Sequence, residues 1–373
     1  MSTLPLVRVL HVQKTRGIGG SERHLLDLLG GLPTEGVDPR MLTLCAPGSD
    51  VFTEALDDRR IRHLEVTAGP DANPALVRRI HREIRMFGAD LVHTHLVHAD
   101  VHGQLAARWS RVPGIASMHS VHAFFRREPV RTAERAAMHS ARRVIAISEH
   151  VASYLVKHRL VPAGRIRVVP YGIDADRWRL SDDDRREERA RYGLDDHAFV
   201  IGMVSRLVRG KGHRVAFEAA RRAASRNPRL HLLVAGTGPL APLLEEEAAR
   251  SAGEIRMLGF VEDVRSLMAA CDVVVVPTEP SLGEGFGLAA LEAMAAGRAT
   301  IVTRVASLPE VVGDVGVVVP PEDPAALADA IVALARDPAE AQDRASRGQA
   351  RARERFSLQK MVGATADVYR EVV

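Results

Sequence analysis

The sequence has few cysteines, few aromatic residues and no long hydrophobic run. Each of these absences argues against a particular class of protein. Cys45 and Cys271 lie in strand-like contexts, and we interpret them as buried thiols in a reducing cytosol. Aromatic residues make up 4% of the chain, too few for a base-stacking surface, so nucleic-acid binding is not expected. No apolar run approaches the roughly 18 residues of a membrane span, and the N-terminus shows no signal-peptide pattern. We therefore expect a cytoplasmic protein.

The composition that is present is that of an ordinary globular protein with an excess of arginine. A length of 373 residues is too great for one ordinary core and suits two domains. The formal charge of +4 favours anionic small molecules or a membrane surface as partners. The stretch from Phe124 to Arg143 combines Phe124 and Phe125 with several arginines, and could rest on an anionic membrane. A solvated helix face is the favoured interpretation.

Apolar runs and amphipathic segments alternate along almost the whole chain. Parallel strands that alternate with helices predict βαβ units and an α/β fold. The expected helices are one that begins at 25–29, then 74–87, 99–108, 149–156, 181–191, 288–296, 325–336, 338–355 and a terminal helix within 356–373. The expected strands are 6–12, 41–45, 61–66, 90–95, 114–117, 144–148, 199–204, 230–235, 255–258, 273–277, 299–303 and 316–319.

The stretch 283–294 combines a glycine-rich loop with two carboxylates. It follows the strand at 273–277 and leads into the helix at 288–296. The free N–H groups at such a helix start bind anions, and glycines let a phosphate approach. Glu284 and Glu292 would be poor phosphate ligands but good acceptors for sugar hydroxyls. This pattern indicates a nucleotide-sugar site; the alternative is that Glu284 favours the helix dipole and Glu292 is a solvated helix residue.

A pair of cations follows the strand at 199–204. Arg206 and Lys211 stand at its carboxyl end, where a guanidinium fork and an ammonium point charge suit a diphosphate. The segment is not a P-loop, because Gly212 occupies the position where Ser or Thr would hold magnesium. Taken alone, the segment could also be an ordinary surface turn.

A second glycine-rich loop follows the first strand of the chain. Gly19, Gly20 and Glu22 lie where a doubly wound domain has its first phosphate-facing turn. The loop fails the dinucleotide fingerprint, because Glu22 replaces the third glycine. The alternative is a tight turn that needs a positive φ.

The histidines suggest two kinds of site. His119 falls just after the strand at 114–117, at the edge where α/β proteins bind ligands, although it could be an ordinary loop histidine. His98 and His102 are four residues apart on an expected helix, which could make a zinc pair. A metal is not expected, because no accompanying metal motif or cysteine ligand is present. The clustered histidines are His93, His95, His98 and His102.

These motifs together resemble the retaining glycosyltransferase family 4. Glu284 and Glu292 match its Glu-x7-Glu, and residues 206–212 match its Arg-Leu-x3-Lys-Gly. Residues 19–22 are similar to its Gly-Gly-x-Glu loop, and residues 235–239 to its Ala-Gly-x-Gly-Pro turn. The resemblance covers essentially the whole chain. It implies a GT-B fold: two Rossmann-like βαβ domains that face each other across a cleft, with a C-terminal helix that crosses back to the first domain.

The resemblance also implies domain limits and residue roles. Residues 1–170 would form the acceptor-side domain, residues 171–355 the nucleotide-sugar domain, and residues 356–373 the returning helix. Roles in catalysis fall to His119, Arg206, Lys211 and Glu284, and acceptor-side roles to Glu22, His95 and His119. Donor binding falls to Gly19, Gly20, Arg206, Lys211, Gly238, Val261, Glu284, Gly285, Phe286, Gly287, Leu288 and Glu292. The family implies no metal and no cofactor, since its substrate is a nucleotide diphosphate sugar.

The expected function is transfer of a hexose or N-acetylhexosamine, with retention, from a UDP-sugar or another nucleotide sugar. The acceptor would be a small molecule, a natural product or a glycan. Two alternatives stay open: a GT-B sugar-nucleotide epimerase and a non-catalytic sugar-nucleotide-binding partner subunit. The sequence departs from the family pattern at Tyr171, where asparagine is usual, and at Ala306-Ser307, where Gly-Gly is common. The second departure puts the acceptor in doubt. The arginine- and alanine-rich composition hints at a bacterial source.

Overall fold

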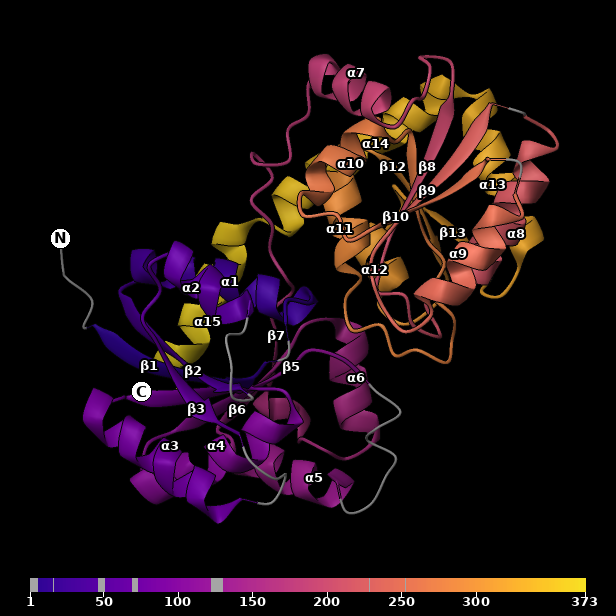
Figure 1. Ribbon diagram of the computed structural model, residues 1–373. Coiled ribbons are helices and arrows are strands. Elements are labelled where there is room, and N and C mark those ends of the chain that lie inside the picture. The colour runs from indigo at the N-terminus through magenta and orange to yellow at the C-terminus, as the bar shows by residue number, and fades with distance from the viewer. Residues whose placement is uncertain are drawn as a thin grey trace. The chain divides into compact units, whose positions relative to one another are not determined.

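A computed structural model describes residues 6–15, 17–45, 51–68, 73–121, 130–227, 229–251 and 253–373. The chain divides into two compact units, and we treat each by itself (Figure 1). Unit 1 comprises Met1–Gly172 together with Leu358–Val373, and unit 2 comprises Ile173–Ser357. The chain thus leaves unit 1 once and returns to it at its end.

Unit 1 is built on a seven-stranded parallel sheet with the order β3-β2-β1-β4-β5-β6-β7. The order reverses between β1 and β4, which is where doubly wound sheets bind ligands at the carboxyl ends of their strands. The strands are β1 Val7–Lys14, β2 Val37–Cys45, β3 His63–Thr67, β4 Leu91–His95, β5 Gly114–Met118, β6 Arg143–Ala146 and β7 Ile166–Val168.

Helices cover both faces of the unit 1 sheet, as Figure 1 shows. Leucines of α1 and side chains of α15 pack on one face, and α3 and α4 pack on the other. The helices are α1 Gly20–Gly31, α2 Val51–Asp58, α3 Pro74–Phe87, α4 Val97–Ser110, α5 Val130–Ser140, α6 Glu149–Lys157 and α15 Leu358–Arg370, with short 3-10 turns η1 Leu32–Glu35 and η3 Ala163–Arg165.

Unit 2 repeats this plan with a six-stranded parallel sheet in the order β10-β9-β8-β11-β12-β13. Its order reverses between β8 and β11. Its strands are β8 Phe199–Val204, β9 Leu230–Ala235, β10 Ile255–Gly259, β11 Val273–Val276, β12 Ala299–Thr303 and β13 Val317–Val319. Its helices are α7 Asp182–Arg191, α8 His213–Ala224, α9 Ala241–Ala249, α10 Val264–Ala270, α11 Leu288–Ala295, α12 Leu308–Val312, α13 Pro324–Arg336 and α14 Pro338–Arg355.

The last helix, α15, belongs to unit 1. Met361, Val362 and Tyr369 are buried in the unit 1 core, and the Met361 sulfur accepts a hydrogen bond from the Gly172 N–H at 3.0 Å. Glu371, just beyond the helix, pairs with arginines of β6 and β7. The expectation of two Rossmann-like α/β domains with a C-terminal helix that returns to the first is therefore confirmed.

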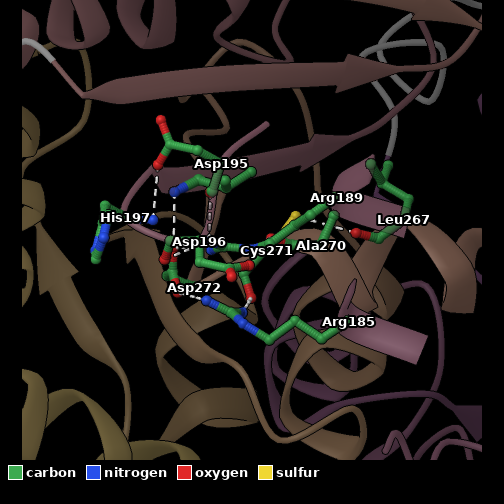
Figure 2. A network of polar contacts seen from close by, with 10 residues as sticks. Arg185, Arg189, Asp195, Asp196, His197, Leu267, Ala270, Cys271 and Asp272 are labelled. Carbon is green, nitrogen blue, oxygen red and sulfur yellow. Dashed lines mark hydrogen bonds and ion pairs between the residues drawn. The ribbon is translucent and has the colours of Figure 1, made fainter. Parts of the chain in front are cut away.

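Helix α7 is held to unit 2 by buried charge rather than by an apolar stripe. The Arg189 side chain is 2% exposed and reaches Asp272, at the start of β11, at 2.8 Å. Arg185, one turn earlier, reaches the other oxygen of Asp272 at 2.5 Å (Figure 2). The same carboxylate accepts the Val200 N–H of β8 at 2.7 Å. Asp272 therefore joins the helix to two adjacent strands of the sheet.

Cys45 and Cys271 are both buried, as predicted. Among the described helices none is long and apolar enough to cross a membrane. The basic and aromatic stretch 124–143 can be followed only from Val130, where α5 begins. Phe124 and Phe125 lie outside the described residues, so the expectation about membrane contact stays a prediction.

Candidate functional site

The loop between β11 and α11 brings Glu284 against Lys211. The Lys211 Nζ lies 2.6 Å from Glu284 Oε2, and the two side chains are 17% and 15% exposed. The Thr278 hydroxyl donates to the same oxygen at 3.3 Å. Two residues predicted to bind different parts of the donor thus form an ion pair with each other. An ammonium has three N–H donors, so Lys211 can keep this contact and still meet a phosphate.

Two glycines allow the loop that carries Lys211 to approach the loop before Glu284. Gly212 has φ +77°, and a Cβ there would lie 1.8 Å from the carbonyl oxygen of Pro277. Gly210 has φ +87°, and a Cβ there would lie 2.7 Å from Leu282. The carbonyl of Gly210 accepts the Glu279 N–H at 2.8 Å. Only glycine fits both the backbone angle and the space, so these positions place the ammonium beside the carboxylate.

Gly287 is the N-cap of α11, with φ +90°. A Cβ at this position would lie 2.5 Å from the side chain of Leu308 on α12. The first N–H groups of a helix have no intrahelical acceptor, and together with the dipole they attract an anion. Phe286 is buried and its ring packs edge-on against Phe356 at 5.6 Å. Any donor contact of Phe286 would therefore come from its backbone. Gly285 is buried and Leu288 half-buried.

Arg206 is exposed on a loop whose backbone is firmly held. Its neighbour Leu207 is 1% exposed and exchanges backbone hydrogen bonds with the turn at Thr237 and Leu240. A Cβ at Gly238 would lie 2.4 Å from the Leu207 carbonyl oxygen, so this turn packs closely against the loop that carries Arg206. Within the described ranges the Arg206 guanidinium has no hydrogen-bond or ion-pair partner in the protein. It is available to an anion.

Glu292 is 5% exposed, so it is not the solvated helix residue of the alternative interpretation. It lies on α11 among buried apolar neighbours such as Leu291 and Ala293. Val261 is half-buried against the apolar cluster around α10, and Gly238 is half-buried. Their predicted contacts with ribose and base stay predictions.

The Ala306-Ser307 departure has a structural consequence beside Glu284. The Ser307 side chain is fully buried, and its hydroxyl donates to the Glu284 carbonyl oxygen at 3.1 Å. Ala306 has φ +50°, an angle that glycine adopts at lower cost. The backbone therefore keeps a glycine-like conformation, while the serine adds a tie to the loop of the predicted site.

Sequence reasoning missed His213, which follows the Lys-Gly motif directly. Its Nε2 lies 2.9 Å from the Ser205 hydroxyl. Burial, together with the charge of Lys211, lowers the pKa of His213 to about 4, so the ring is neutral. Its position at the first residue of α8, next to Lys211, was the available signal. Through its contact with Ser205, His213 supports the loop that carries Arg206 and Lys211.

In unit 1, the Glu22 carboxylate folds back onto its own loop. Its Oε2 accepts the Gly19 N–H and the Ser21 hydroxyl, both at 2.9 Å, and its Oε1 accepts the Gln13 amide at 2.5 Å. Glu22 is 7% exposed, whereas Gly20 is exposed and Gly19 half-buried. The structure thus places Glu22 as a support of the glycine loop at the start of α1, whatever its role toward an acceptor.

His95 and His119 lie together at the carboxyl ends of β4 and β5. His95 Nδ1 and His119 Nε2 are 3.0 Å apart, and His119 Nδ1 is 2.6 Å from the Tyr171 hydroxyl. Burial lowers the pKa of His119 to about 3 and that of His95 well below its usual range. Tyr171, the residue that departs from the family's asparagine, is therefore a direct partner of His119. Its ring also stacks on His24 at 4.2 Å.

The histidines that could meet a metal differ from the predicted pair. In the part of the chain that the structure describes, His11, His93 and His95 offer ring nitrogens within 4.8 Å of one another. By contrast, His102 accepts the Asn73 N–H and contacts the carbonyl of His98, so it has a structural role in joining α3 and α4. The sequence did not predict His11 as a candidate ligand, because no motif links β1 to β4.

Comparisons with known proteins match most of the chain. A family model described as Glycosyltransferase Family 4 matches residues 18–177, and one described as Glycosyl transferases group 1 matches residues 198–337. D-inositol 3-phosphate glycosyltransferase 2 of Catenulispora acidiphila is 31% identical, over 96% of this chain and 92% of that protein. Alpha-maltose-1-phosphate synthase of Mycolicibacterium smegmatis is 28% identical, over 76% of this chain and 79% of that protein.

Solved structures show the same fold over nearly the whole chain. Anabaena HepE in complex with UDP and glucose aligns with a TM-score of 0.86 and 23% identity, covering 98% of this chain and 99% of that one. Sucrose-phosphate synthase from Thermosynechococcus elongatus aligns with a TM-score of 0.81 and 22% identity, covering 98% of each chain. The likeness in fold, the two matched models and the 31% identical full-length relative lead to one conclusion: the chain belongs to glycosyltransferase family 4.

Proposed function

We propose that this glycosyltransferase moves a hexose or N-acetylhexosamine from a nucleoside diphosphate sugar, preferably a UDP-sugar, to a small-molecule, natural-product or glycan acceptor. Transfer would proceed with retention at the anomeric carbon and without a metal ion. The observation that carries the proposal is the Lys211–Glu284 pair at 2.6 Å, on two loops of which one also carries the exposed Arg206 and the other leads into α11. This arrangement offers cations to a diphosphate and carboxylate oxygens to a sugar.

The proposed chemistry depends on stabilising a diphosphate leaving group. As the bond from the anomeric carbon to the phosphate oxygen breaks, negative charge grows on the phosphate and the sugar becomes oxocarbenium-like. Arg206, Lys211 and the α11 N–H groups would stabilise that charge in a preorganised site. The acceptor hydroxyl attacks the same face, and its proton passes to the departing phosphate oxygen. No protein nucleophile is needed, and the cations take the place of a metal.

The remaining proposed roles are those that the family resemblance implies. Glu284 would bind sugar hydroxyls, and Glu292 the ribose hydroxyls. Gly19 and Gly20 would close over the phosphates, with the backbone near Gly238 and Val261 facing the nucleotide. His119 would stand beside the sugar, with His95 and Glu22 on the acceptor side. Several relatives are named D-inositol 3-phosphate glycosyltransferases, which supports testing a phosphorylated cyclitol among the candidate acceptors.

Product analysis tests the proposal. The protein is incubated with UDP-glucose, UDP-N-acetylglucosamine or GDP-mannose and a panel of acceptors, with and without EDTA. We expect an acceptor glycoside whose anomeric configuration, measured by NMR, equals that of the donor, at a rate that EDTA leaves unchanged. An epimerised nucleotide sugar formed without acceptor would favour the epimerase alternative. Nucleotide binding without any product would favour a partner subunit.

A further inference from the structure

Seven buried side chains of unit 1 form one unbranched series of hydrogen bonds. It begins at Tyr171, whose ring stacks on His24 of α1, and ends inside the sheet, and it passes through side chains of β1, β4, β5 and α15. We call it the imidazole series, because four of its members are histidines. In order, its members are Tyr171, His119, His95, His11, Tyr369, His93 and Ser117.

The first half of the imidazole series connects the predicted site histidine to β1. Tyr171 and His119 Nδ1 are 2.6 Å apart, and His119 Nε2 and His95 Nδ1 are 3.0 Å apart. His95 Nε2 then meets His11 Nδ1 at 3.1 Å, with the two rings nearly parallel at 6°. Both nitrogens of His95 and of His119 are therefore engaged within the protein.

The second half turns back from the C-terminal helix into the sheet. The Tyr369 hydroxyl of α15 lies 3.4 Å from His11 Nε2 and 2.7 Å from His93 Nδ1. His93 Nε2 ends the series at the Ser117 hydroxyl, at 2.7 Å. Tyr369 is fully buried, and among the described residues it is the one that joins the two halves by hydrogen bonds.

The proton count allows only two complete orderings of this series. Burial lowers the pKa of all four histidines far enough to keep them neutral at pH 7. A neutral imidazole has one N–H, so a ring that donates on one side must accept on the other. A tyrosine hydroxyl between two rings likewise donates to one and accepts from the other. All four rings therefore carry the proton on Nδ1, or all four carry it on Nε2.

Ser117 selects between the two orderings. It is 2% exposed, and among the described residues its hydroxyl has His93 Nε2 as its hydrogen-bond partner. If His93 donated to Ser117, the buried O–H would be left without an acceptor, which is unfavourable. Ser117 therefore donates to His93, and each proton along the imidazole series takes the Nδ1 position. At the far end, His119 donates to Tyr171.

We propose that the imidazole series locks His11, His93, His95 and His119 into one shared Nδ1–H tautomer, and that Tyr369 on α15 is the positioning residue at its centre. The orientation of the site histidine is then set partly by the last helix of the chain, through Tyr369 and His11, to which the proposed function gives no substrate contact. Its consequence for transfer rests on the proposed function, whereas the tautomers do not.

The tautomers are measured directly by long-range 1H–15N correlation NMR of 15N-histidine-labelled protein, at neutral pH and without any substrate. We expect the signals of all four histidines, assigned by single His→Gln variants, to be those of the Nδ1–H form. A mixture of tautomers among the four, an all-Nε2 pattern, or a charged ring would overturn the proposal. Stoichiometric zinc bound to the purified protein would overturn it too, because a metal would take the place of the shared protons.

Tyr369→Phe tests the central position, since it keeps the ring and removes only the hydroxyl. The matched control is Tyr154→Phe, on α6 of the same unit and outside the series. We expect His95 and His119 to lose their single tautomer in Tyr369→Phe and to keep it in the control. Unchanged His119 signals in a folded Tyr369→Phe protein would contradict the proposal. If the variant does not fold, the wild-type pattern still decides the tautomers.

The functional consequence has its own measurement. In Tyr369→Phe we expect kcat to fall about tenfold, with the KM for the donor little changed, because the substitution loosens the orientation of His119 and leaves the donor-binding groups in place. Tyr154→Phe should match the wild type. An unchanged kcat would remove the positioning role. A wild type that transfers no sugar would refute the proposed function. The NMR test of the tautomers does not depend on sugar transfer, so its result would still hold.

Discussion

Lys211 and Glu284 come from loops 73 residues apart and meet where the backbone approach is one that only glycines permit. Each is partly buried, so each depends on the other for charge compensation. Removal of one partner of such a pair leaves the other uncompensated, and that cost exceeds the net value of the pair. The same two groups are proposed to receive the donor phosphate and the donor sugar, so activity and local stability should be linked at this point.

We expect Lys211→Met to lower the transfer rate about 10²- to 10³-fold, the range found for loss of one charge-stabilising donor. Glu284→Gln should also lower the rate. The double variant should lose much less than the product of the single effects, because the pair acts as a unit. Steady-state kinetics measures all three, with Lys157→Met on α6 as the control that leaves the rate unchanged. Multiplicative losses would mean that the two residues act independently.

Gly212→Ala should destabilise unit 2 and abolish most of the activity. A Cβ there meets the Pro277 carbonyl oxygen at 1.8 Å, in addition to the cost of φ +77°. Gly253→Ala is the matched control: its φ is +95°, but a Cβ there meets nothing within 4 Å. We expect a loss of roughly 1–2 kcal/mol in the control, from backbone strain alone, and a larger loss in Gly212→Ala. Urea unfolding monitored by circular dichroism provides both values, and equal losses would contradict the close approach of the two loops.

Sequence reasoning at this scale named candidate residues but not the contacts between them. The resemblance of their motifs to those of the family named Arg206, Lys211 and Glu284, whereas the cation segment taken alone could also have been a surface turn. The resemblance could not show that Lys211 pairs with Glu284, nor that Tyr369 meets His11, which is 358 residues away. Such contacts depend on which strands become neighbours, and the chain order alone does not contain that information.

At the scale of elements, α7 depends on Asp272 more than on its own composition. Nearly all its residues are charged, and the sequence predicted it as a charged helix. In the structure Arg189 is 2% exposed against Asp272 and against carbonyl oxygens of Ala270, Asp195 and Asp196 (Figure 2). Desolvation lowers the pKa of Arg189, and the Asp272 charge opposes that shift. The Asp272 carboxylate therefore offsets the free-energy cost of burying the charged Arg189 guanidinium.

Asp272→Asn should therefore lower the free energy of unfolding of unit 2 by about 3 kcal/mol, the order expected when one partner of a buried ion pair is removed. Glu246→Gln is the control, because its pair with Arg250 lies on the surface with side chains 65% and 72% exposed. Its effect should be close to zero. Thermal unfolding followed by calorimetry compares the two. A small effect of Asp272→Asn would show that α7 is held by something else.

Strands were predicted more completely than helices, for a physical reason. A strand in a parallel sheet is buried on both faces, so it appears as an uninterrupted apolar run such as 273–277. Helix α8 was missed because its buried face consists largely of alanines, although Ala216, Phe217 and Ala220 have helical spacing. The end of α3 at Phe87 was predicted correctly, since Gly88 caps it in the left-handed conformation.

At the scale of the whole molecule, the two units differ in how many neutral histidines they bury. Among the described residues of unit 1, burial lowers the pKa of five histidines: His11, His24, His93, His95 and His119. In unit 2 the lowered pKa values are those of His213 and His231. An imidazole whose pKa is lowered by folding stabilises the fold above about pH 6.5, and that stability is lost as the pH falls.

Two carboxyl groups of unit 1 work in the opposite direction. Burial raises the pKa of Asp100 to about 7, and burial with the Asp100 charge raises that of Glu134 well above its usual range. They bind protons more tightly in the folded state, so they add stability as the pH falls from about 7 to 4. Each group contributes at most about 1.4 kcal/mol per pH unit. Five histidines outweigh two carboxyls, and unit 1 should lose stability on acidification.

We therefore expect unit 1 to lose amide protection between pH 6.5 and 5 while unit 2 retains most of it. Hydrogen exchange with mass spectrometry, corrected for the intrinsic pH dependence of exchange, measures peptides of each unit separately. Peptides of β1, β4 and β5 should lose protection first. Equal loss in the two units, or protection of unit 1 down to pH 4, would contradict the neutral, buried state of these histidines.

The most direct test of the account is nucleotide binding measured by isothermal titration calorimetry. The wild type, Arg206→Ala and Arg209→Ala are titrated with UDP, GDP, ADP and dTDP. Arg209 lies three residues further along the same exposed loop and serves as the control. We predict that the wild type and Arg209→Ala bind one base series, UDP first, and that Arg206→Ala binds it about tenfold or more weakly. No binding of any nucleotide, or equal binding by all three proteins, would contradict the donor site on which the account depends.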